Sequence, residues 1–181
     1  MKLNTVISIG KELAAAYDTA DPEGLCAELG IILLHFPMGT AQRSVKGFIL
    51  KNDGKVAITL NSDLSEDMKR VVFYHEFSHY ILHIRTGLAE QIQDCNVYDS
   101  VSEAEYEANL LAAELQITDE CAMEALRETG DFFTAAGILR VPPELLDFKI
   151  RILRDKGYRI PCAPLTASGS YLRDLGTGAA S

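Results

Sequence analysis

Two histidines and a glutamate near the middle of the chain have the types and the spacing of a metal site. Residues 75–79 read His-Glu-Phe-Ser-His, which is the pattern His-Glu-x-x-His. On a helix, His75 and His79 lie about 40° apart around the axis, so both imidazole rings can reach one metal ion. Glu76 lies about 100° from His75, at the edge of the same face. The pattern therefore predicts a hydrolytic metal site in which Glu76 takes a proton from a metal-bound water.

A five-residue pattern of this kind can also arise by chance, with its histidines on the surface or in the core. The chain has 4 histidines, and two of them, His75 and His79, fall in the motif. The residues around them are largely apolar, which predicts a buried helix, and an unpaired imidazole would be costly there. These features favour a metal site over a chance pattern.

A hydrolytic zinc site usually has three protein ligands and one open position. His83 is the nearest further histidine, one turn along the same predicted helix. Three ligands spaced i, i+4 and i+8 would spread over about 12 Å of helix axis, which is too long for one ion. We therefore interpret His83 as a neighbour of the ligands or as an ordinary core histidine.

The acidic helix predicted after the motif is the better source of a third ligand. Its residues Glu105, Asn109 and Gln116 form one polar stripe flanked by alanines, and small flanking side chains allow two helices to approach closely. Glu105 would reach the metal of the neighbouring helix. Asn109, one turn further, would accept a hydrogen bond from the free N–H of a ligand histidine and fix its tautomer.

Glu105 also has a purely structural interpretation. Ser102-x-x-Glu105 is a capping box, in which the carboxylate only satisfies the start of the helix. The spacing alone does not decide between ligand and cap, and Glu103 and Glu107 remain alternative ligands. Glu107 and Glu114 lie on the opposite side of the helix, and we expect both to be solvated.

The elements around the motif follow from apolar periodicity, caps and turns. Ser65 and the acidic residues after it predict the start of the motif helix, which would end near Arg85. Asp53-Gly54 between two β-rich segments predicts a hairpin. The other expected elements are a helix near 9–17, a helix that begins after Asp21 and stops at Gly30, a strand at 31–36, hairpin strands at 45–50 and 56–60, and a helix at 102–117.

Beyond residue 117 the chain is expected to form short capped helices. Segment 118–158 is predicted to be a helical unit that resembles a helix-turn-helix, and segment 159–181, rich in small residues and proline, a flexible tail. Five cations of this region would form a basic stripe: Lys149, Arg151, Arg154, Lys156 and Arg159. The alternative to an enzyme is therefore a non-catalytic metal-containing binding module that regulates a repressor or toxin partner by contact.

The overall charge bears on the choice of partner. The 181 residues include 17 Lys and Arg against 26 Asp and Glu, a formal net charge of -9. Nucleic-acid affinity depends on neutralising phosphates, so no direct nucleic-acid partner is expected, whereas an acidic surface suits a basic protein. No segment has the roughly 18 apolar residues of a membrane span, and neither a signal peptide nor paired cysteines are evident. We expect a cytoplasmic protein without a membrane partner.

The chain resembles the ImmA/IrrE family of metallopeptidases. The resemblance rests on the segments 58–61 and 70–83, on Glu105-Tyr106-Glu107-Ala108-Asn109 with the residues up to 115, and on 134–153. The family pattern joins His-Glu-x-x-His to a distal Glu-x-Glu-Ala-Asn-x-Phe-Ala-Ala-Glu-Leu. This chain departs from it at Leu111, where the family favours Phe, and at 116–118, but neither departure touches the expected ligands.

The resemblance implies an α+β fold: a minimal zincin core (1–117) with a small antiparallel sheet packed on the motif helix, followed by a C-terminal helical segment. It implies a metal held by His75, His79 and Glu105, with Glu76 as general base. Zn²⁺ is the default for two imidazoles and a carboxylate, although Mn²⁺ and Fe²⁺ also fit these donors. The implied substrate is a protein, typically a basic helix-turn-helix repressor of a mobile element or stress response, cleaved at a specific site.

Overall fold

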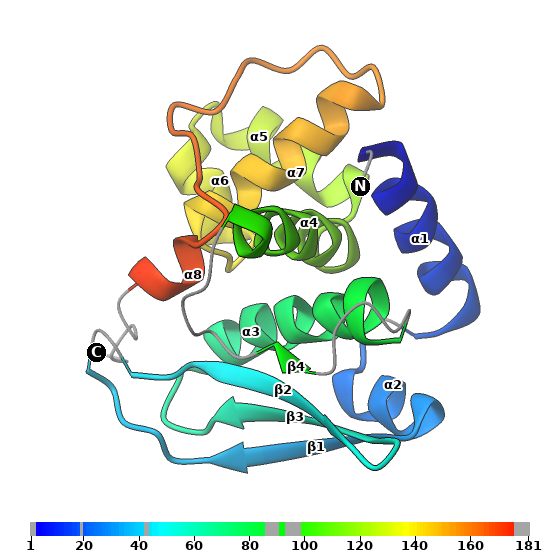
Figure 1. The fold of residues 1–181 in the computed structure, drawn as a ribbon. Helices are drawn as coiled ribbons and strands as arrows, with labels where there is room; N and C mark the ends of the chain where they lie inside the picture. The colour runs from blue at the N-terminus through cyan, green and yellow to red at the C-terminus, as the bar shows by residue number, and fades with distance from the viewer. Residues whose placement is uncertain (1–2, 19, 42–43, 86–90, 93–98, 176–181) are drawn as a thin grey trace.

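The computed structural model describes residues 3–18, 20–41, 44–85, 91–92 and 99–175. Its helices and strands are α1 (Leu3–Ala16), α2 (Pro22–Leu29), β1 (Ile31–Phe36), β2 (Gly47–Asn52), β3 (Lys55–Asn61), α3 (Glu66–His79) with a π-helical turn (Tyr80–Ile84), β4 (Gln91–Ile92), α4 (Asp99–Gln116), α5 (Asp119–Thr129), α6 (Phe132–Ile138), α7 (Pro143–Asp155) and α8 (Tyr171–Asp174). Figure 1 shows them as layers: the sheet at the bottom, α3 on it, α4 above α3, and α5–α7 at the top. The predicted α+β class is confirmed.

The sheet is mixed, whereas the sequence analysis expects an antiparallel one. The predicted hairpin is present, with Asp53 and Gly54 at φ of 48° and 76° in the turn and β2 antiparallel to β3. The strand order is β1-β3-β2-β4, and β1 pairs with β3 in parallel. The reason is that the hairpin folds back so that β3 lies between β1 and β2. Buried Asn61 holds the β1–β2 connection, because its Nδ2 donates to the carbonyls of Gly39 and Val45.

Helix α3 lies directly on the sheet. Ser65 caps it by accepting the N–H of Met68, as predicted. Gly47 of β2 allows the close approach of the sheet, since a Cβ there would lie 2.5 Å from Cγ1 of Val72. After His79 the helix widens into the π-helical turn, which ends with the N–H of Arg85 bonded to the carbonyl of Tyr80.

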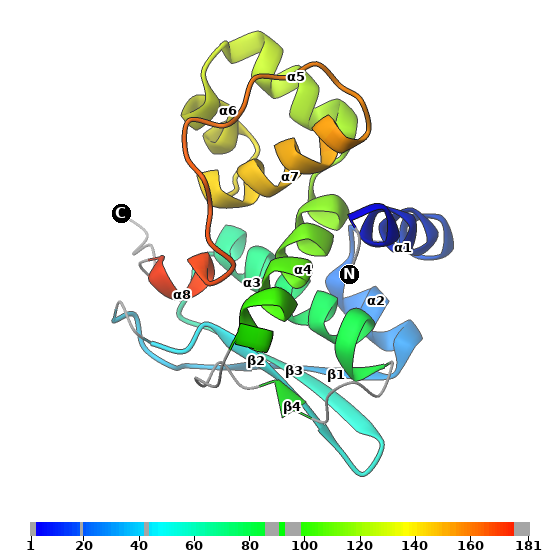
Figure 2. The ribbon, with the colours of Figure 1, turned by 45° about the horizontal axis from the view of Figure 1, so that its top comes forward.

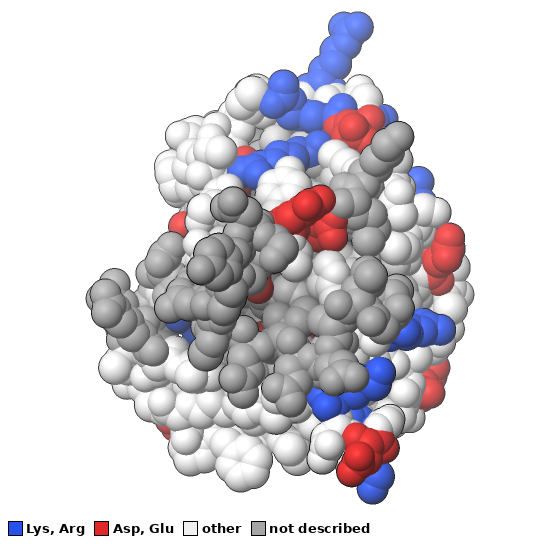
Figure 3. Space-filling view, in the orientation of Figure 1, with Lys and Arg blue, Asp and Glu red and all other residues white. Residues whose placement is uncertain are grey.

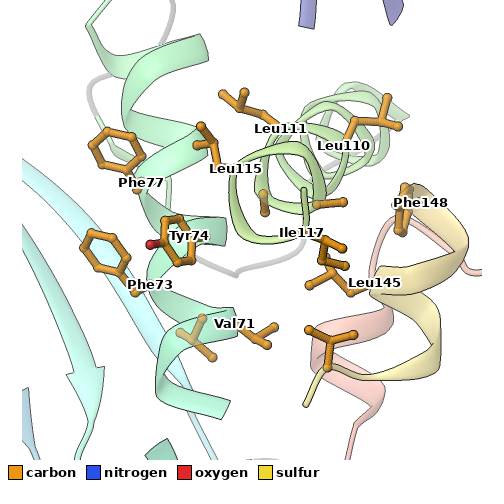
Figure 4. Packing of buried hydrophobic residues seen from close by; sticks show 14 of the residues in the cluster. Val71, Phe73, Tyr74, Phe77, Leu110, Leu111, Leu115, Ile117, Leu145 and Phe148 are labelled. Atoms are coloured by element: carbon orange, nitrogen blue, oxygen red, sulfur yellow. The ribbon is translucent and has the colours of Figure 1, made fainter. Parts of the chain in front are cut away.

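Helix α4 joins the sheet layer to the upper helices. It packs against α3 on one side and against α7 and α1 on others. Figure 4 shows the apolar side chains between them, from α3, from α4 with the residue that follows it, and from α7: Val71, Phe73, Tyr74, Phe77, Leu110, Leu111, Leu115, Ile117, Leu145 and Phe148. This shared core fixes α4 relative to α3. None of the helices in the described part of the chain is long and apolar enough to cross a membrane.

The upper helices begin at the predicted caps. Thr118 and Asp131 accept backbone N–H groups at the starts of α5 and α6, and Gly130 ends α5 in a left-handed conformation. Figure 2 shows α5–α7 grouped at the far end of α4, away from the sheet. Residues 159–175 differ from the loose tail expected from their composition. Tyr171 and Leu172 are buried, because the Tyr171 ring packs 5.8 Å from the ring of Phe148. Residues 176–181 lie outside the described part.

Candidate metal centre

Two neighbouring helices bring His75, His79 and Glu105 together. The imidazole Nε2 atoms of His75 and His79 are 3.1 Å apart. One carboxylate oxygen of Glu105 lies 3.2 Å from Nε2 of His75, and the other lies 3.2 Å from Nε2 of His79. All three side chains are buried, and their ligand atoms form a group that could hold a metal ion. The histidines come from α3 and the carboxylate from α4.

The spacing of these atoms fits a small divalent cation. In a tetrahedral zinc site with bonds of about 2.0–2.1 Å, neighbouring ligand atoms are about 3.3 Å apart. The contacts between the three side chains are 3.1–3.2 Å. Two imidazoles and one carboxylate are also the donor set of many hydrolytic zinc sites. The residues present therefore fit a metal ion with three protein ligands.

Small residues on α4 allow the close approach that this contact needs. Ala108, Ala112 and Ala113 of α4 are buried, and α4 packs against α3. A short side chain at these positions lets the two backbones approach. The carboxylate of Glu105 can then reach the histidines of α3. This agrees with the expectation that alanines flank the polar stripe.

Asn109 fixes the tautomer of His75, as the sequence analysis predicts for one of the ligand histidines. Its Oδ1 lies 2.8 Å from Nδ1 of His75. An amide oxygen only accepts hydrogen bonds, so Nδ1 of His75 must carry the proton. In the neutral ring the lone pair is then on Nε2, the atom that faces His79 and Glu105.

The electrostatics of the cluster favour one bound cation. Burial opposes protonation of His75, but the hydrogen bond with Glu105 and its charge outweigh burial and raise the pKa of His75 to about 9. Burial lowers the pKa of His79 to about 4. Burial opposes ionisation of Glu105, but the hydrogen bonds from both histidines outweigh it and lower the carboxyl pKa. Without a metal, His75 is thus protonated on both ring nitrogens at neutral pH, whereas His79 is neutral. A metal ion would replace the proton on Nε2 of His75.

Glu76 and His83 lie next to the ligand group without belonging to it. Glu76 is 8% exposed, and its charge contributes to the raised pKa of His75. His83 is in the π-helical turn, with its ring 5.5 Å from the ring of His79. Burial lowers the pKa of His83, although a hydrogen bond with the backbone of Ala104 opposes the shift. The roles expected of Glu76 as general base and of His83 beside the ligands stay predictions.

The capping interpretation of Glu105 does not fit the structure. Helix α4 begins at Asp99, three residues before Ser102, so Ser102 lies inside the helix and cannot be its N-cap. The Glu105 carboxylate contacts the histidines instead. Glu107 was expected to be solvated and is 7% exposed.

Glu114 was also expected to be solvated and is instead part of a partly buried ion-pair cluster. It contacts the ammonium groups of Lys149 and Lys156 at 2.7 and 2.6 Å. Asp119 lies 2.6 Å from Lys149 and 2.8 Å from Lys156. Gly10 of α1 packs against Glu114, since a Cβ at Gly10 would lie 2.7 Å from Cγ of Glu114. We refer to these four charged residues as the lysine cluster.

Four of the five cations of the predicted basic stripe, all except Arg159, contact acids or other groups of the chain. Lys149 and Lys156 belong to the lysine cluster. Arg151 pairs with Asp147, and Arg154 contacts the sulfur of Cys162. On the face drawn in Figure 3, Lys and Arg side chains gather at the α5–α7 end, and acidic side chains lie beside some of them.

One contact of the site was missed by the sequence analysis. Nδ2 of Asn109 donates to the backbone carbonyl of Gly169, 60 residues away. A backbone acceptor has no residue type that would mark it in a sequence. The composition around Gly169 indicates a flexible tail, so nothing in the sequence pointed to this contact.

Comparison with known proteins agrees with this geometry. No curated protein matches the chain. A family model described as the IrrE N-terminal-like domain, peptidase M78, matches residues 26–151, which is more than half of the chain and includes the three candidate ligands. The predicted resemblance is confirmed. The chain belongs to the IrrE N-terminal-like family of peptidases.

Proposed function

We propose that this protein is a metal-dependent endopeptidase whose ligands are His75, His79 and Glu105 and whose general base is Glu76. The observation that carries the proposal is the buried triangle of two imidazole nitrogens and one carboxylate, with contacts of 3.1–3.2 Å. A structural metal site is usually closed by four protein ligands, whereas a catalytic one keeps a position open. The described part of the chain brings three such side chains together, and this number favours catalysis.

Each residue has a distinct task in this reaction. A bound divalent cation, Zn²⁺ by default, supplies Lewis-acid polarisation of the peptide carbonyl and lowers the pKa of water. Glu76, buried beside His75, accepts a proton from the attacking water and returns it to the leaving nitrogen. Asn109 keeps the proton of His75 on Nδ1, so that Nε2 is available as a ligand.

We further propose that the substrate is a helix-turn-helix repressor. Two observations support this substrate class. The net charge of -9 suits a basic protein partner, and the resemblance to the ImmA/IrrE family implies such repressors. Four of the five cations that would have formed a basic stripe for direct DNA binding, all except Arg159, have partners within the chain. A protein substrate is therefore preferred over a nucleic acid.

The general base is tested with Glu76→Gln. We expect this variant to retain its metal and to cleave a repressor encoded beside its gene about 100- to 10,000-fold more slowly than the wild type, because the amide cannot accept the proton. Cleavage is followed by gel electrophoresis and mass spectrometry, and bound metal by elemental analysis. The matched control is Glu103→Gln, which removes an exposed carboxylate from α4. It should cleave normally.

The outcomes separate the parts of the proposal. Wild-type cleavage rates in Glu76→Gln would show that the base is misassigned. A metal-loaded wild-type protein that cleaves other polypeptides but leaves the repressor intact would contradict only the substrate class. Elemental analysis of the protein purified without added metal identifies the ion, and a stoichiometric metal other than Zn²⁺, such as Mn²⁺ or Fe²⁺, would correct the default.

A further inference from the structure

The segment between α7 and α8 returns from the upper helices to α4. We refer to residues 159–170 as the C-terminal strap. In Figures 1 and 2 it is the orange to red segment that runs from the end of α7 back to α8, which lies beside α4. Ala167 of the strap and Tyr171 just after it are buried. The strap is therefore a packed part of the molecule.

Two charged residues of α7 hold the strap at Ala167. The N–H of Ala167 donates to Oδ2 of Asp147 at 2.9 Å, and its carbonyl accepts from Nη2 of Arg151 at 3.0 Å. Asp147 and Arg151 also pair with each other. The Arg151 guanidinium lies 4.7 Å from the centre of the Phe148 ring, which adds a cation–π contact. Both polar groups of one strap residue are thus bound to the same ion pair.

Two residues further on, the strap contacts the metal centre through Asn109. The Gly169 carbonyl accepts from Nδ2 of Asn109, while Oδ1 of Asn109 accepts from Nδ1 of His75. The side-chain amide has its donors on one end and its acceptor on the other. When the strap takes the donor end, the acceptor end must face His75. Turning the amide over would lose both hydrogen bonds and set its N–H against the ring.

We propose that the C-terminal strap is a positioning element of the metal centre, which acts through Asn109 on His75. Asp147 and Arg151 fix Ala167, and through it the Gly169 carbonyl that orients the amide. They are positioning residues, because they act on His75 only through the strap and Asn109. This inference rests on the proposed metal centre and extends it to α7, which the chain reaches more than 30 residues after Asn109.

The test compares zinc affinities in a double-mutant cycle, with a chromophoric chelator as competitor. Asn109→Ala should weaken zinc binding about 10- to 100-fold, the usual cost of losing a partner of a ligand histidine. Asp147→Ala should weaken it about 3- to 10-fold, because the strap then fixes the amide less well. The double variant should bind no more weakly than Asn109→Ala, since Asp147 acts through the amide.

Further variants keep the test decisive. Arg151→Ala breaks the same strap contact from a half-buried position, and it replaces Asp147→Ala if circular dichroism shows that the latter does not fold. Lys69→Ala removes an ion pair of α3 with Glu66 and should leave zinc affinity unchanged. In ¹⁵N NMR of the zinc-loaded protein, the Nδ1 proton of His75 should exchange with water faster in Asp147→Ala than in Lys69→Ala.

Three results would contradict the proposals. Wild-type zinc affinity in both Asp147→Ala and Arg151→Ala would overturn the role of the strap while leaving the metal centre intact. Losses that multiply in the double variant would also overturn it, because the strap would then act by general stability. A wild-type protein that binds no zinc, manganese or iron would refute the metal centre itself.

Discussion

Two of the acidic side chains of helix α4 that are shielded from solvent, Glu105 and Glu114, have partners of different kinds. Near its start, Glu105 faces the imidazole rings of two histidines at 3.2 Å. Near its end, Glu114 faces the ammonium groups of Lys149 and Lys156 at 2.7 and 2.6 Å. The side chains of Glu105 and Glu114 are only 11% and 7% exposed, so an uncompensated charge on either would be costly. The negative charges of these two carboxylates are therefore compensated in two different ways within one helix.

The difference lies in where the compensating charge comes from. In the lysine cluster, two ammonium groups balance the carboxylates of Glu114 and Asp119, so the chain supplies its own cations. Around Glu105 the partners are imidazoles, which are charged only when protonated. That acid depends on a proton or a metal ion from outside. Glu114, which is paired with lysines, therefore stabilises the fold, whereas Glu105, which is paired with histidines, is left able to bind a metal ion.

The largest effect should follow from removing a ligand. His79→Ala leaves one imidazole and one carboxylate, and we expect zinc affinity to fall by more than about 100-fold, beyond the loss typical of groups that only support ligands. Isothermal titration calorimetry measures this directly. Glu114→Gln is the matched control at the other end of α4, and it should bind zinc as the wild type does. Equal losses in both variants would break the distinction between the two acids.

Removing a lysine should affect stability and leave metal binding intact. Lys149 is only 1% exposed in its side chain, and Lys149→Met would leave two carboxylates with Lys156 alone. We expect the free energy of unfolding to fall by about 3 kcal/mol, as for other broken buried pairs. Urea denaturation of the metal-free protein measures the loss. The double variant Lys149→Met/Glu114→Gln should recover part of the lost free energy of unfolding. A loss in the double variant as large as in Lys149→Met alone would contradict the ion-pair explanation.

The two clusters should also differ in their response to pH. Metal must displace the proton that the pKa of about 9 keeps on His75, so the apparent zinc affinity should fall about tenfold for each pH unit below 9, with about one proton released. In the metal-free protein the same raised pKa stabilises the fold below about pH 6.5, and this contribution is lost as the pH rises through about 9. Calorimetry in buffers of different ionisation enthalpy counts the protons.

The lysine cluster should be insensitive over the same range. Burial opposes ionisation of Asp119, but hydrogen bonds from Lys149 and Lys156 outweigh it and lower the carboxyl pKa. The stabilising contribution of Asp119 is therefore present above the unfolded pKa of about 3.8 and is lost as the pH falls through the folded value.

The zinc titration has an outcome that would contradict the role of His75. Zinc affinity that is constant between pH 6 and 9 would mean that His75 is not the protonated group.

The sequence predicted the part of the site that lies within one helix. His75, Glu76 and His79 are fixed relative to one another by helix geometry, which is a local property. Sequence spacing was not enough to assign Glu105 as a ligand, because the same spacing also fits a capping box. Only the resemblance favoured the ligand, and the start of α4 at Asp99 removed the alternative. A contact between two helices depends on how they pack, which local spacing does not contain.

The predictions that failed concern partners far apart in the chain. Glu114 and Lys149 each look like ordinary surface charges until α7 packs on α4. The hairpin was predicted from Asp53-Gly54, but the parallel pairing of β1 with β3 depends on where the hairpin folds back. The tail was expected to be loose because of its composition. Its packing depends on contacts with Asp147 and Phe148 of α7, which the composition does not show. Such long-range contacts leave no periodic signal.

The π-helical turn at Tyr80–Ile84 divides the work of one continuous helix. A wide turn of this kind takes up one extra residue without breaking the helix. Before it, the interval between the two ligand histidines is the ordinary four-residue step. Residues of the wider turn, among them His83, lie at other angles around the axis than they would in a regular α-helix. Changes within the widened turn can therefore move His83 relative to the rings of His75 and His79 without altering the four-residue interval between those two histidines.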